Sequence, residues 1–295
     1  MSIETTEAAR PGILAPDTGM GAVTLRVADL DAMIAYYRDG VTLELLAQEG
    51  GRAVLGRGGV PAVILEHAPG MRHASPGEAG LFHTAIVFDS RAALASAIYR
   101  VASRYPGTFT GSADHLVSEA FYFTDPEGNG VELYFDRDRS TWSWVHGQVE
   151  MATIYLDPNE YLREHLTEAG AATAELLGDA VVGHVHLSVG DVASAREFYV
   201  DRLGFETTAT LGDQALFVSA GGYHHHMAMN TWNSRGAGRR RPVLGLGKVE
   251  IVVPGAEDVG ELAERMRHYR VPLRDDGRVL AFDDPWANLV EVRTA

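Results

Sequence analysis

The stretch DPEGNGVE, residues 125–132, returns later in the chain as DPWANLVE, residues 284–291. The two copies share the pattern D-P-x-x-N-x-V-E. Proline and asparagine favour a turn, and the residues after them alternate as they do in a half-buried strand. A turn that leads into a strand and occurs twice indicates that the chain contains internal repeats.

Each copy closes a longer unit, and four such units can be traced outward from these two stretches. Every unit opens with a short strand of high β propensity and continues into an amphipathic helix with apolar residues near i, i+3 or i+4, and i+7. Acidic or serine residues at the helix starts are suitable N-caps. The opening strands are AVTLRV (22–27), HTAIVF (83–88), HVHLSV (184–189) and KVEIVV (248–253). Each unit is therefore predicted to be a βαβββ module.

These modules predict an α+β fold. A single curled sheet of this size leaves one face bare, so we expect the four βαβββ modules to pair into two curled-sheet domains. Residues 1–140 contain the N-terminal pair of modules and residues 181–295 the C-terminal pair. Residues 141–180 lack the repeat and are predicted to be a connector, with a short helix in NEYLREHLTEAG (159–170).

The composition limits the classes of partner. The 295 residues suffice for two domains with hydrophobic cores, and a net charge of -15 argues against nucleic acid and anionic membranes as partners. The sequence has no cysteine, so any metal must be bound by His, Asp or Glu. The first residues, MSIETTEAARPG, lack the apolar core of a signal peptide, and no segment has the apolar length of a membrane span. We therefore expect a cytoplasmic protein.

Two histidines occupy the same position in two of the repeats. His83 opens the strand of the second module and His184 that of the third, whereas the other two modules have Ala22 and Lys248 there. One strand histidine is usually a structural residue, but two at one repeat position favour a shared role. Together with Glu132 they supply two imidazoles and one carboxylate, a set that suits Fe(II) and leaves coordination positions open. Mn(II) is the alternative.

The pairing of the modules decides whether these residues meet. If the second module pairs with the third, His83, Glu132 and His184 share one site, and we prefer this arrangement because it uses all three. If the modules pair in tandem, His184 is separated from the other two. The site would then use His184, a residue of the strand with residues 224–226, and Glu291.

The residues that lead up to Glu132 resemble a known signature. DHLVSEAFYFTDPEGNGVE (114–132) is similar to the motif of the extradiol catechol dioxygenases of the vicinal-oxygen-chelate superfamily: a histidine, a spacer, an apolar–tyrosine pair, an acid–proline turn and the ligand glutamate. Ala113 departs from the motif, which usually has Gly, Asn, Thr or an aliphatic β-branched residue there. GHVHLSV (183–189) resembles a module opening of the superfamily. The resemblance covers nearly the whole chain and is greatest to the two-domain catechol 2,3-dioxygenases of Gram-positive bacteria.

A third stretch, GGYHHHMA (221–228), resembles the strand of the family that carries an active-site acid–base histidine. The match gives this role to His225, with His226 as the second candidate. Alternation along a strand would place His224 and His226 on one face and His225 on the other.

The resemblance implies two vicinal-oxygen-chelate domains, one catalytic and one a degenerate scaffold. In the catalytic domain, Tyr122 is expected to hydrogen-bond the bound oxygens and His115 to orient the substrate near the mouth of the site. The implied activity is Fe(II)-dependent cleavage of the ring of catechol or a substituted catechol by O2, beside the two hydroxyls. The product would be of the 2-hydroxymuconic semialdehyde type.

Two other functions fit modules of this kind. A glyoxalase-like lyase or isomerase would add a fourth protein ligand, for which Glu66 and His67 are the candidates. A non-catalytic, drug-sequestering protein would have little need for two histidines, a glutamate and a histidine-rich strand together. The partners expected for the dioxygenase are a small aromatic diol and O2, and an acidic enzyme of this size is compatible with a homo-oligomer.

Overall fold

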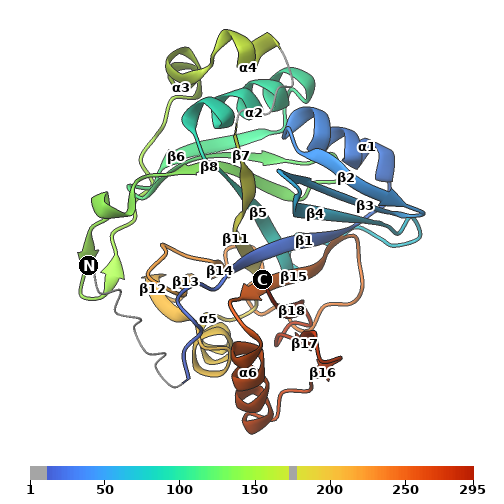
Figure 1. Cartoon of the computed structure of the whole chain (residues 1–295), viewed down its shortest axis with the longest axis vertical. Coiled ribbons are helices and arrows are strands. Elements are labelled where there is room, and N and C mark those ends of the chain that lie inside the picture. The colour runs from blue at the N-terminus through green and yellow to red at the C-terminus, as the bar shows by residue number, and fades with distance from the viewer. Residues whose placement is uncertain (1–11, 173–177) are drawn as a thin grey trace, which may run out of the picture.

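The computed structural model describes residues 12–172 and 178–295. It has two eight-stranded sheets flanked by helices, which confirms the predicted α+β fold of paired modules (Figure 1). The prediction about a signal peptide concerns the first residues of the chain, of which 1–11 lie outside the described residues. Among the residues that are described, no helix is long and apolar enough to cross a membrane.

The first sheet combines the first and fourth modules in the order β16-β17-β18-β15-β1-β4-β3-β2. At its centre β1 and β15 pair antiparallel, so the two modules form one continuous sheet. Its strands are β1 (Gly19–Val27), β2 (Glu44–Glu49), β3 (Arg52–Arg57), β4 (Val60–His67), β15 (Gly245–Val253), β16 (Arg274–Asp275), β17 (Val279–Asp283) and β18 (Leu289–Thr294).

The second sheet combines the third and second modules in the order β12-β13-β14-β11-β5-β8-β7-β6, with β11 and β5 antiparallel at its centre. The preferred pairing of the second module with the third is therefore confirmed, and tandem pairing is wrong. Each sheet therefore contains one module from the N-terminal half of the chain and one from the C-terminal half. The predicted domain boundaries at residues 140 and 181 stay a prediction. The strands are β5 (Gly80–Phe88), β6 (Phe109–Asp114), β7 (Ser118–Thr124), β8 (Gly130–Asp136), β11 (Ala180–Ser188), β12 (Glu206–Leu211), β13 (Ala215–Ser219) and β14 (Met227–Asn230).

One helix follows the opening strand of each module: α1 (Leu30–Ala35), α2 (Arg91–Arg104), α5 (Val192–Arg196) and α6 (Ala256–His268). Asp29, Ser90 and Asp191 cap the first three, because each side chain accepts from a backbone N–H of the first turn. The sequence pattern predicts a regular helix in each module. In the structure, however, α1 and α5 widen into π-helical turns, η1 (Tyr36–Gly40) and η3 (Glu197–Arg202).

These π-helical turns carry tyrosines that hold the two copies of the repeated turn. Tyr37 of η1 donates to Asp125 Oδ2 at 3.2 Å, and Tyr199 of η3 donates to Asp284 Oδ2 at 2.9 Å. Both carboxylates also accept from the asparagine side chain later in the same turn. Consecutive modules are thus joined by contacts between a helix and a turn, whereas the sheets join the second module to the third and the first to the fourth.

The connector contains more structure than predicted. After a short 3-10 turn, η2 (Arg139–Thr141), it forms a hairpin of β9 (Trp144–Val145) and β10 (Gln148–Val149). The single helix predicted over 159–170 is two short helices, α3 (Pro158–His165) and α4 (Glu168–Ala172), because Leu166 is extended between them. Both lie against α2 at one end of the molecule (Figure 1).

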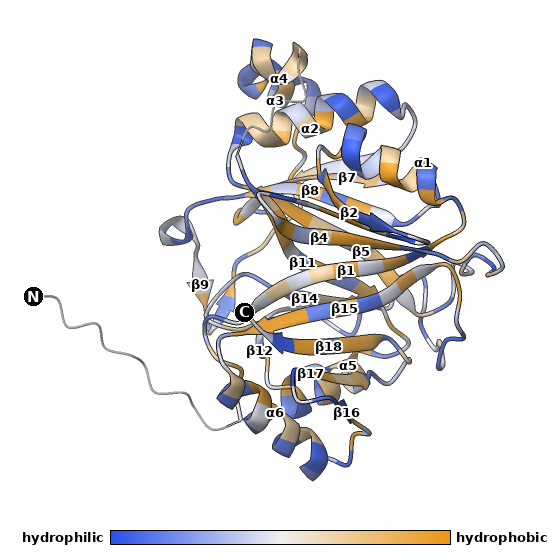
Figure 2. Ribbon diagram, turned by 45° about the vertical axis from the view of Figure 1, so that its right-hand side comes forward, coloured by the Kyte–Doolittle hydropathy of each residue, from blue (hydrophilic) through white to orange (hydrophobic). Residues whose placement is uncertain are grey.

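The two sheets and their helices share one apolar core. In Figure 2 the strands are largely hydrophobic, whereas α2 and α6 carry both hydrophobic and hydrophilic residues, as helices at the edge of a core do. Along β11, Val185 and Leu187 belong to this core, so alternation directs His184 and His186 to the opposite face of the second sheet. That face carries the candidate site.

Candidate metal centre

The three predicted metal ligands lie in one row across the adjacent strands β11, β5 and β8. His184 is paired with Ala85 of β5, and Ala85 is paired with Glu132 of β8. His83 lies two residues before Ala85 on the same face. Glu132 Oε2 is 2.9 Å from His83 Nε2 and 3.1 Å from His184 Nε2. The structure therefore brings His83, Glu132 and His184 together, with exposed fractions of 6%, 2% and 2%.

The donor atoms of this row fit a divalent metal ion. One nitrogen of each histidine and one carboxylate oxygen lie within 4.8 Å of one another. Within the described part of the chain, the buried His83 Nε2 takes part in no well-directed hydrogen bond, although the Glu132 carboxylate is 2.9 Å away. His184 Nε2 is within hydrogen-bond distance of the same Glu132 oxygen, at 3.1 Å, so all three donor atoms converge on one place, as the ligands of a cation do.

The charges of the row also suit a cation. Burial opposes ionisation of Glu132, but the adjacent imidazoles of His184 and His83 outweigh burial and hold the pKa of the carboxyl well below its usual value. Burial lowers the pKa of His184 to about 4, because the imidazolium ion loses its hydration there. Near neutral pH the row offers a carboxylate and an unprotonated imidazole, which are the forms that bind metals.

A second polar group adjoins His184. The His225 ring centroid is 4.1 Å from that of His184, and His225 Nδ1 is 2.8 Å from His224 Nδ1. His224 Nε2 donates to Asp136 Oδ1 at 2.9 Å, and the Tyr223 hydroxyl donates to Asp136 Oδ2 at 2.7 Å. A carboxylate only accepts, so a neutral His224 carries its proton on Nε2 and its Nδ1 accepts from His225. This contact leaves the lone pair of His225 on Nε2.

His226 has different partners. Its Nδ1 accepts from the Ala220 N–H at 3.2 Å. Its ring packs against Tyr223 and Phe205, with centroid distances of 4.8 Å and 6.2 Å. These contacts give His226 a part in the packing of the loop before β14.

The closing strand of the third module starts later than predicted. β14 begins at Met227, and residues 224–226 precede it. Strand alternation therefore does not separate the three histidines. Within the loop, the His225 ring packs against His184, and the other two rings pack against Tyr223.

Tyr122 and His115 adjoin the row near Glu132. Tyr122 lies opposite Glu132 in the pairing of β7 with β8, and its ring centroid is 5.7 Å from that of His83. Its hydroxyl is 2.7 Å from His115 Nε2, and His115 Nδ1 is 2.6 Å from the Ala152 carbonyl oxygen. Burial, and then the Glu132 carboxylate, raise the pKa of Tyr122 well above its usual value. The hydroxyl therefore keeps its proton near neutral pH.

Comparison with known proteins shows the family of the chain. The sequence profile of the glyoxalase/bleomycin resistance protein/dioxygenase superfamily matches residues 19–133 and 181–292. The chain belongs to this superfamily.

One relative within the superfamily is the catechol-2,3-dioxygenase of Bacillus subtilis (strain 168), which is 34% identical over 278 residues, 91% of this chain and 94% of the relative. The crystal structure of a Bacillus subtilis protein provisionally named a dioxygenase superposes with a TM-score of 0.63 at 16% identity, over 94% of this chain and 84% of that one. Glyoxalase I from Zea mays superposes with a TM-score of 0.56 at 17% identity, over 94% and 92%. These two structures support the fold.

The alternative metal ligands that were considered from the sequence lie in the first sheet. Glu291 is on β18, where Lys248 Nζ donates to its Oε2 at 2.6 Å. Glu66 and His67 are on β4, and His67 Nε2 bonds the Ala28 carbonyl oxygen at 3.1 Å. The structure therefore separates Glu291 from the second sheet, contrary to the tandem arrangement, and it also separates the two residues considered as a fourth ligand.

Two residues of the site were not predicted from the sequence. His186 is buried opposite His83 in the pairing of β11 with β5, and its Nε2 accepts from Asn230 Nδ2 at 2.9 Å. The available signal was its spacing, because residues two apart in a strand share a face with one another, here His184 and His186. Asp136 gave no such signal, since its partners come from a different module.

Proposed function

We propose that this chain is an Fe(II)-dependent extradiol dioxygenase that opens the ring of catechol or a substituted catechol with O2, to a 2-hydroxymuconic semialdehyde-type product. The observation that carries the proposal is the buried row of His83, Glu132 and His184, in a chain that is 34% identical to a catechol-2,3-dioxygenase. Its partners are a small aromatic diol and O2, and we place the enzyme in the cytoplasm.

His83, Glu132 and His184 would hold the metal. When bound, Fe(II) supplies open coordination positions for the diol and O2 and lets electrons pass between them. Two nitrogens and one carboxylate do not select strictly between neighbouring divalent ions, so Mn(II) is the alternative. Metal analysis of protein purified without added metal distinguishes the two.

His225 is assigned as the acid–base residue. Its ring packs against His184, and its Nε2 lone pair is available because Nδ1–H is donated to His224. Burial lowers the pKa of His225 well below its usual value, so the ring is neutral near pH 7 and its Nε2 lone pair is free before the proton of the diol arrives. His226 remains the second candidate, and its contacts with Ala220 and Tyr223 make it the weaker one.

Tyr122 is assigned to hydrogen-bond the substrate oxygens, and His115 is assigned to orient the substrate. Tyr122 stands opposite Glu132 and its ring centroid is 5.7 Å from that of His83, so a diol held at the row would be within reach of its hydroxyl. His115 is half-buried beside it and would orient the diol at the mouth of the site.

The test is ring cleavage by iron-loaded protein. Metal-free protein is loaded with Fe(II) under nitrogen, and a series of diols is added with and without air while the absorbance of the yellow ring-fission product is recorded. The proposal predicts product in air and none under nitrogen, because O2 is consumed. Absence of product with every diol would remove the assignment, and turnover that needs no O2 would favour a glyoxalase-like lyase.

A matched pair of variants ties the activity to the row. Glu132→Gln removes the carboxylate ligand, whereas Glu291→Gln changes the corresponding residue of the repeat in the first sheet, where the partner is Lys248. We expect the first variant to lose its bound iron and its activity and the second to keep both. Equal losses in the two variants would contradict the ligand assignment.

A further inference from the structure

The turn between β6 and β7 presents His115 through an unusual backbone. The His115 N–H donates to the Ser118 carbonyl at 2.9 Å and closes the turn. Leu116, at its tip, has a φ of 70°, in the left-handed region that leucine rarely adopts. A conformation of this kind persists only where the surroundings hold it.

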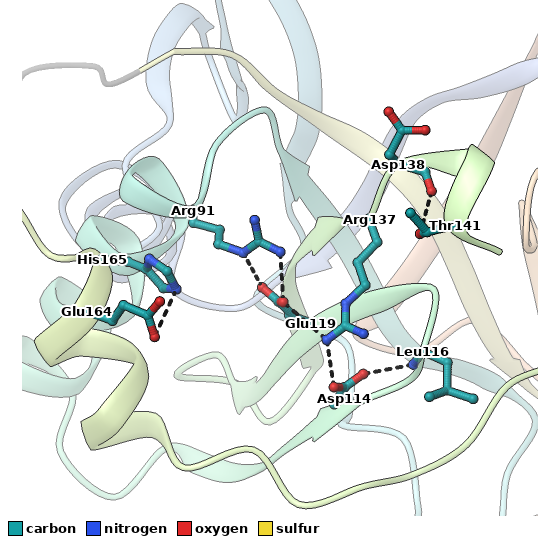
Figure 3. A network of polar contacts seen from close by, with 9 residues as sticks. All are labelled: Arg91, Asp114, Leu116, Glu119, Arg137, Asp138, Thr141, Glu164 and His165. Atoms are coloured by element: carbon teal, nitrogen blue, oxygen red, sulfur yellow. Dashed lines mark hydrogen bonds and ion pairs between the residues drawn. The ribbon is translucent and has the colours of Figure 1, made fainter.

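A chain of ion pairs holds this turn from the side of α2, as Figure 3 shows. Asp114 Oδ1 accepts from the Leu116 N–H at 2.8 Å, and Asp114 Oδ2 accepts from Arg137 at 2.6 Å. Arg137 also donates to Glu119 at 3.3 Å, and Arg91 of α2 donates to both oxygens of Glu119 at 2.8 Å and 2.9 Å. The turn is thereby fixed to a helix and to the ends of β7 and β8.

The connector holds the same turn through its backbone. The Asp114 N–H donates to the Ile154 carbonyl at 2.8 Å, and the Ile154 N–H donates back to the Asp114 carbonyl at 3.0 Å. This bridge places the Ala152 carbonyl oxygen 2.6 Å from His115 Nδ1. The segment that joins the two halves of the chain therefore contacts a candidate active-site histidine directly.

These contacts determine where His115 carries its proton. A carbonyl oxygen only accepts, so His115 Nδ1 must donate to Ala152. In the neutral ring, Nε2 then has the lone pair and accepts from the Tyr122 hydroxyl at 2.7 Å. The Glu132 carboxylate is also within hydrogen-bond reach of the Tyr122 hydroxyl, but in the proposed site that carboxylate binds the metal. The Tyr122 proton then points toward His115, and the lone pairs of its oxygen are left for another donor.

We propose that the connector is a working part of the active site: the Ala152 carbonyl fixes His115 in its Nδ1–H form, and His115 thereby turns the Tyr122 hydroxyl into a hydrogen-bond acceptor for a diol hydroxyl. Ala152 and His115 are positioning residues in this arrangement, and Tyr122 is the group that touches substrate. The consequence for the diol rests on the proposed function, whereas the proton position on His115 does not.

The proton position can be measured without turnover. Nitrogen NMR of metal-free protein with 15N-labelled histidine distinguishes a protonated ring nitrogen from an unprotonated one, and His115→Gln identifies the signals of His115. We expect Nδ1 to be protonated and Nε2 to be unprotonated. An Nε2–H ring at His115 would overturn the inference even in an active enzyme.

The role of the connector is tested by Ile154→Pro, with Tyr155→Ala as the matched control. The proline removes the N–H donated to Asp114, whereas Tyr155 is the exposed neighbour at 77% exposure. We expect Ile154→Pro to return His115 to a mixture of forms and to raise the KM for the diol about tenfold, a loss of about 1.4 kcal/mol. An unchanged His115 spectrum in a folded Ile154→Pro protein would contradict the role.

Two substitutions of His115 test the same role if Ile154→Pro fails to fold. His115→Gln can extend an amide oxygen to the Nε2 position and accept from Tyr122, whereas His115→Asn can replace only the Nδ1–H donor. We expect His115→Asn to raise KM about as much as Tyr122→Phe and His115→Gln to raise it less. Equal KM values for the two His115 variants would contradict the role of Nε2 as the acceptor. If the wild type opens no diol, the proposed function fails and the NMR result still decides the proton position.

Discussion

His225 and His226 are neighbours in the chain but differ in what their ring nitrogens contact. His225 Nδ1 bonds the ring of His224, which leaves Nε2 available beside His184. His226 Nδ1 is occupied by the Ala220 N–H. We therefore expect His225→Asn to lower kcat/KM by about 100-fold and His226→Asn by less than about tenfold. Steady-state kinetics on iron-loaded protein, with iron content checked in each variant, measures both, and a larger loss in His226→Asn would reverse the assignment.

The roles of single residues were predictable where the repeat exposes them. His83 and His184 stand at one repeat position, and Glu132 ends a repeated turn, so comparison within the chain was sufficient to select them. The role of the Ala152 carbonyl could not be predicted, because every residue type has the same backbone oxygen. His115, which donates to that oxygen, was predicted only from the resemblance to the dioxygenase family.

At the scale of elements, the D-P-x-x-N turn is both a turn and a contact between modules. Asp125 is buried and accepts from Tyr37 of η1 as well as from its own turn. Burial raises its pKa from 3.8 to about 6. Because the folded-state pKa is the higher one, protonation favours the folded state. This stabilisation is fully present below about pH 4 and is lost as the pH rises through about 6.

The expected result is a pH dependence that one substitution removes. The free energy of unfolding of metal-free wild type, relative to that of Asp125→Asn, should fall by about 2 kcal/mol between pH 4 and pH 7, since each pKa unit corresponds to about 1.4 kcal/mol and part of the loss occurs below pH 4. Urea unfolding of both proteins across this range measures the difference. Parallel pH profiles for the two proteins would contradict it.

A glycine in β11 makes room for a buried tyrosine. A Cβ on Gly183 would clash with the hydroxyl of Tyr134, which is hydrogen-bonded to the Tyr223 hydroxyl at 2.7 Å. We expect Gly183→Ala to lower the free energy of unfolding by about 1–3 kcal/mol, as other overpacked sites do. Gly19→Ala is the control, because the Cβ position of Gly19 in β1 is open. Thermal unfolding compares them, and equal stability of the two variants would show that the site can adjust.

The sequence predicted the order of elements better than their details. Apolar periodicity and N-caps gave the four strand–helix openings, but the π-helical turns of η1 and η3 have the same periodic pattern as a regular helix. The closing strand predicted to include residues 224–226 begins only at Met227, because local propensity does not show where pairing with β11 and β13 starts. The break at Leu166 is equally local and was missed.

At the scale of the whole molecule, the two sheets have the same topology but carry different side chains at equivalent positions. Lys248 and Glu291 of the first sheet correspond in the repeat to His83 and Glu132 of the second. Lys248 Nζ lies 2.6 Å from Glu291 and 3.7 Å from Glu250, so an ammonium group provides positive charge there. A metal ion would have to compete with a covalently attached cation for the same carboxylates.

We therefore expect one tightly bound divalent ion per chain. Metal-free protein titrated with Fe(II) under nitrogen, followed by desalting and elemental analysis, should retain one equivalent of iron. Lys248→Ala should not abolish this binding, because the first sheet is outside the proposed site. Two retained equivalents in the wild type would contradict the view that only the second sheet binds metal.

The pairing of modules was predictable for a global reason. Each module by itself is consistent with either pairing, but only the pairing of the second with the third brings His83, Glu132 and His184 together. The requirement for a complete ligand set therefore selected the topology that the structure has.

Whether the row of His83, Glu132 and His184 binds the metal is decided by a crystal structure of protein loaded with Fe(II) under nitrogen, with diffraction data collected on both sides of the iron absorption edge. We expect one anomalous peak per chain, bonded to His83 Nε2, His184 Nε2 and the Glu132 carboxylate. A peak among His184, His224 and His225, which are also close enough to hold an ion, or no peak in the second sheet, would contradict it.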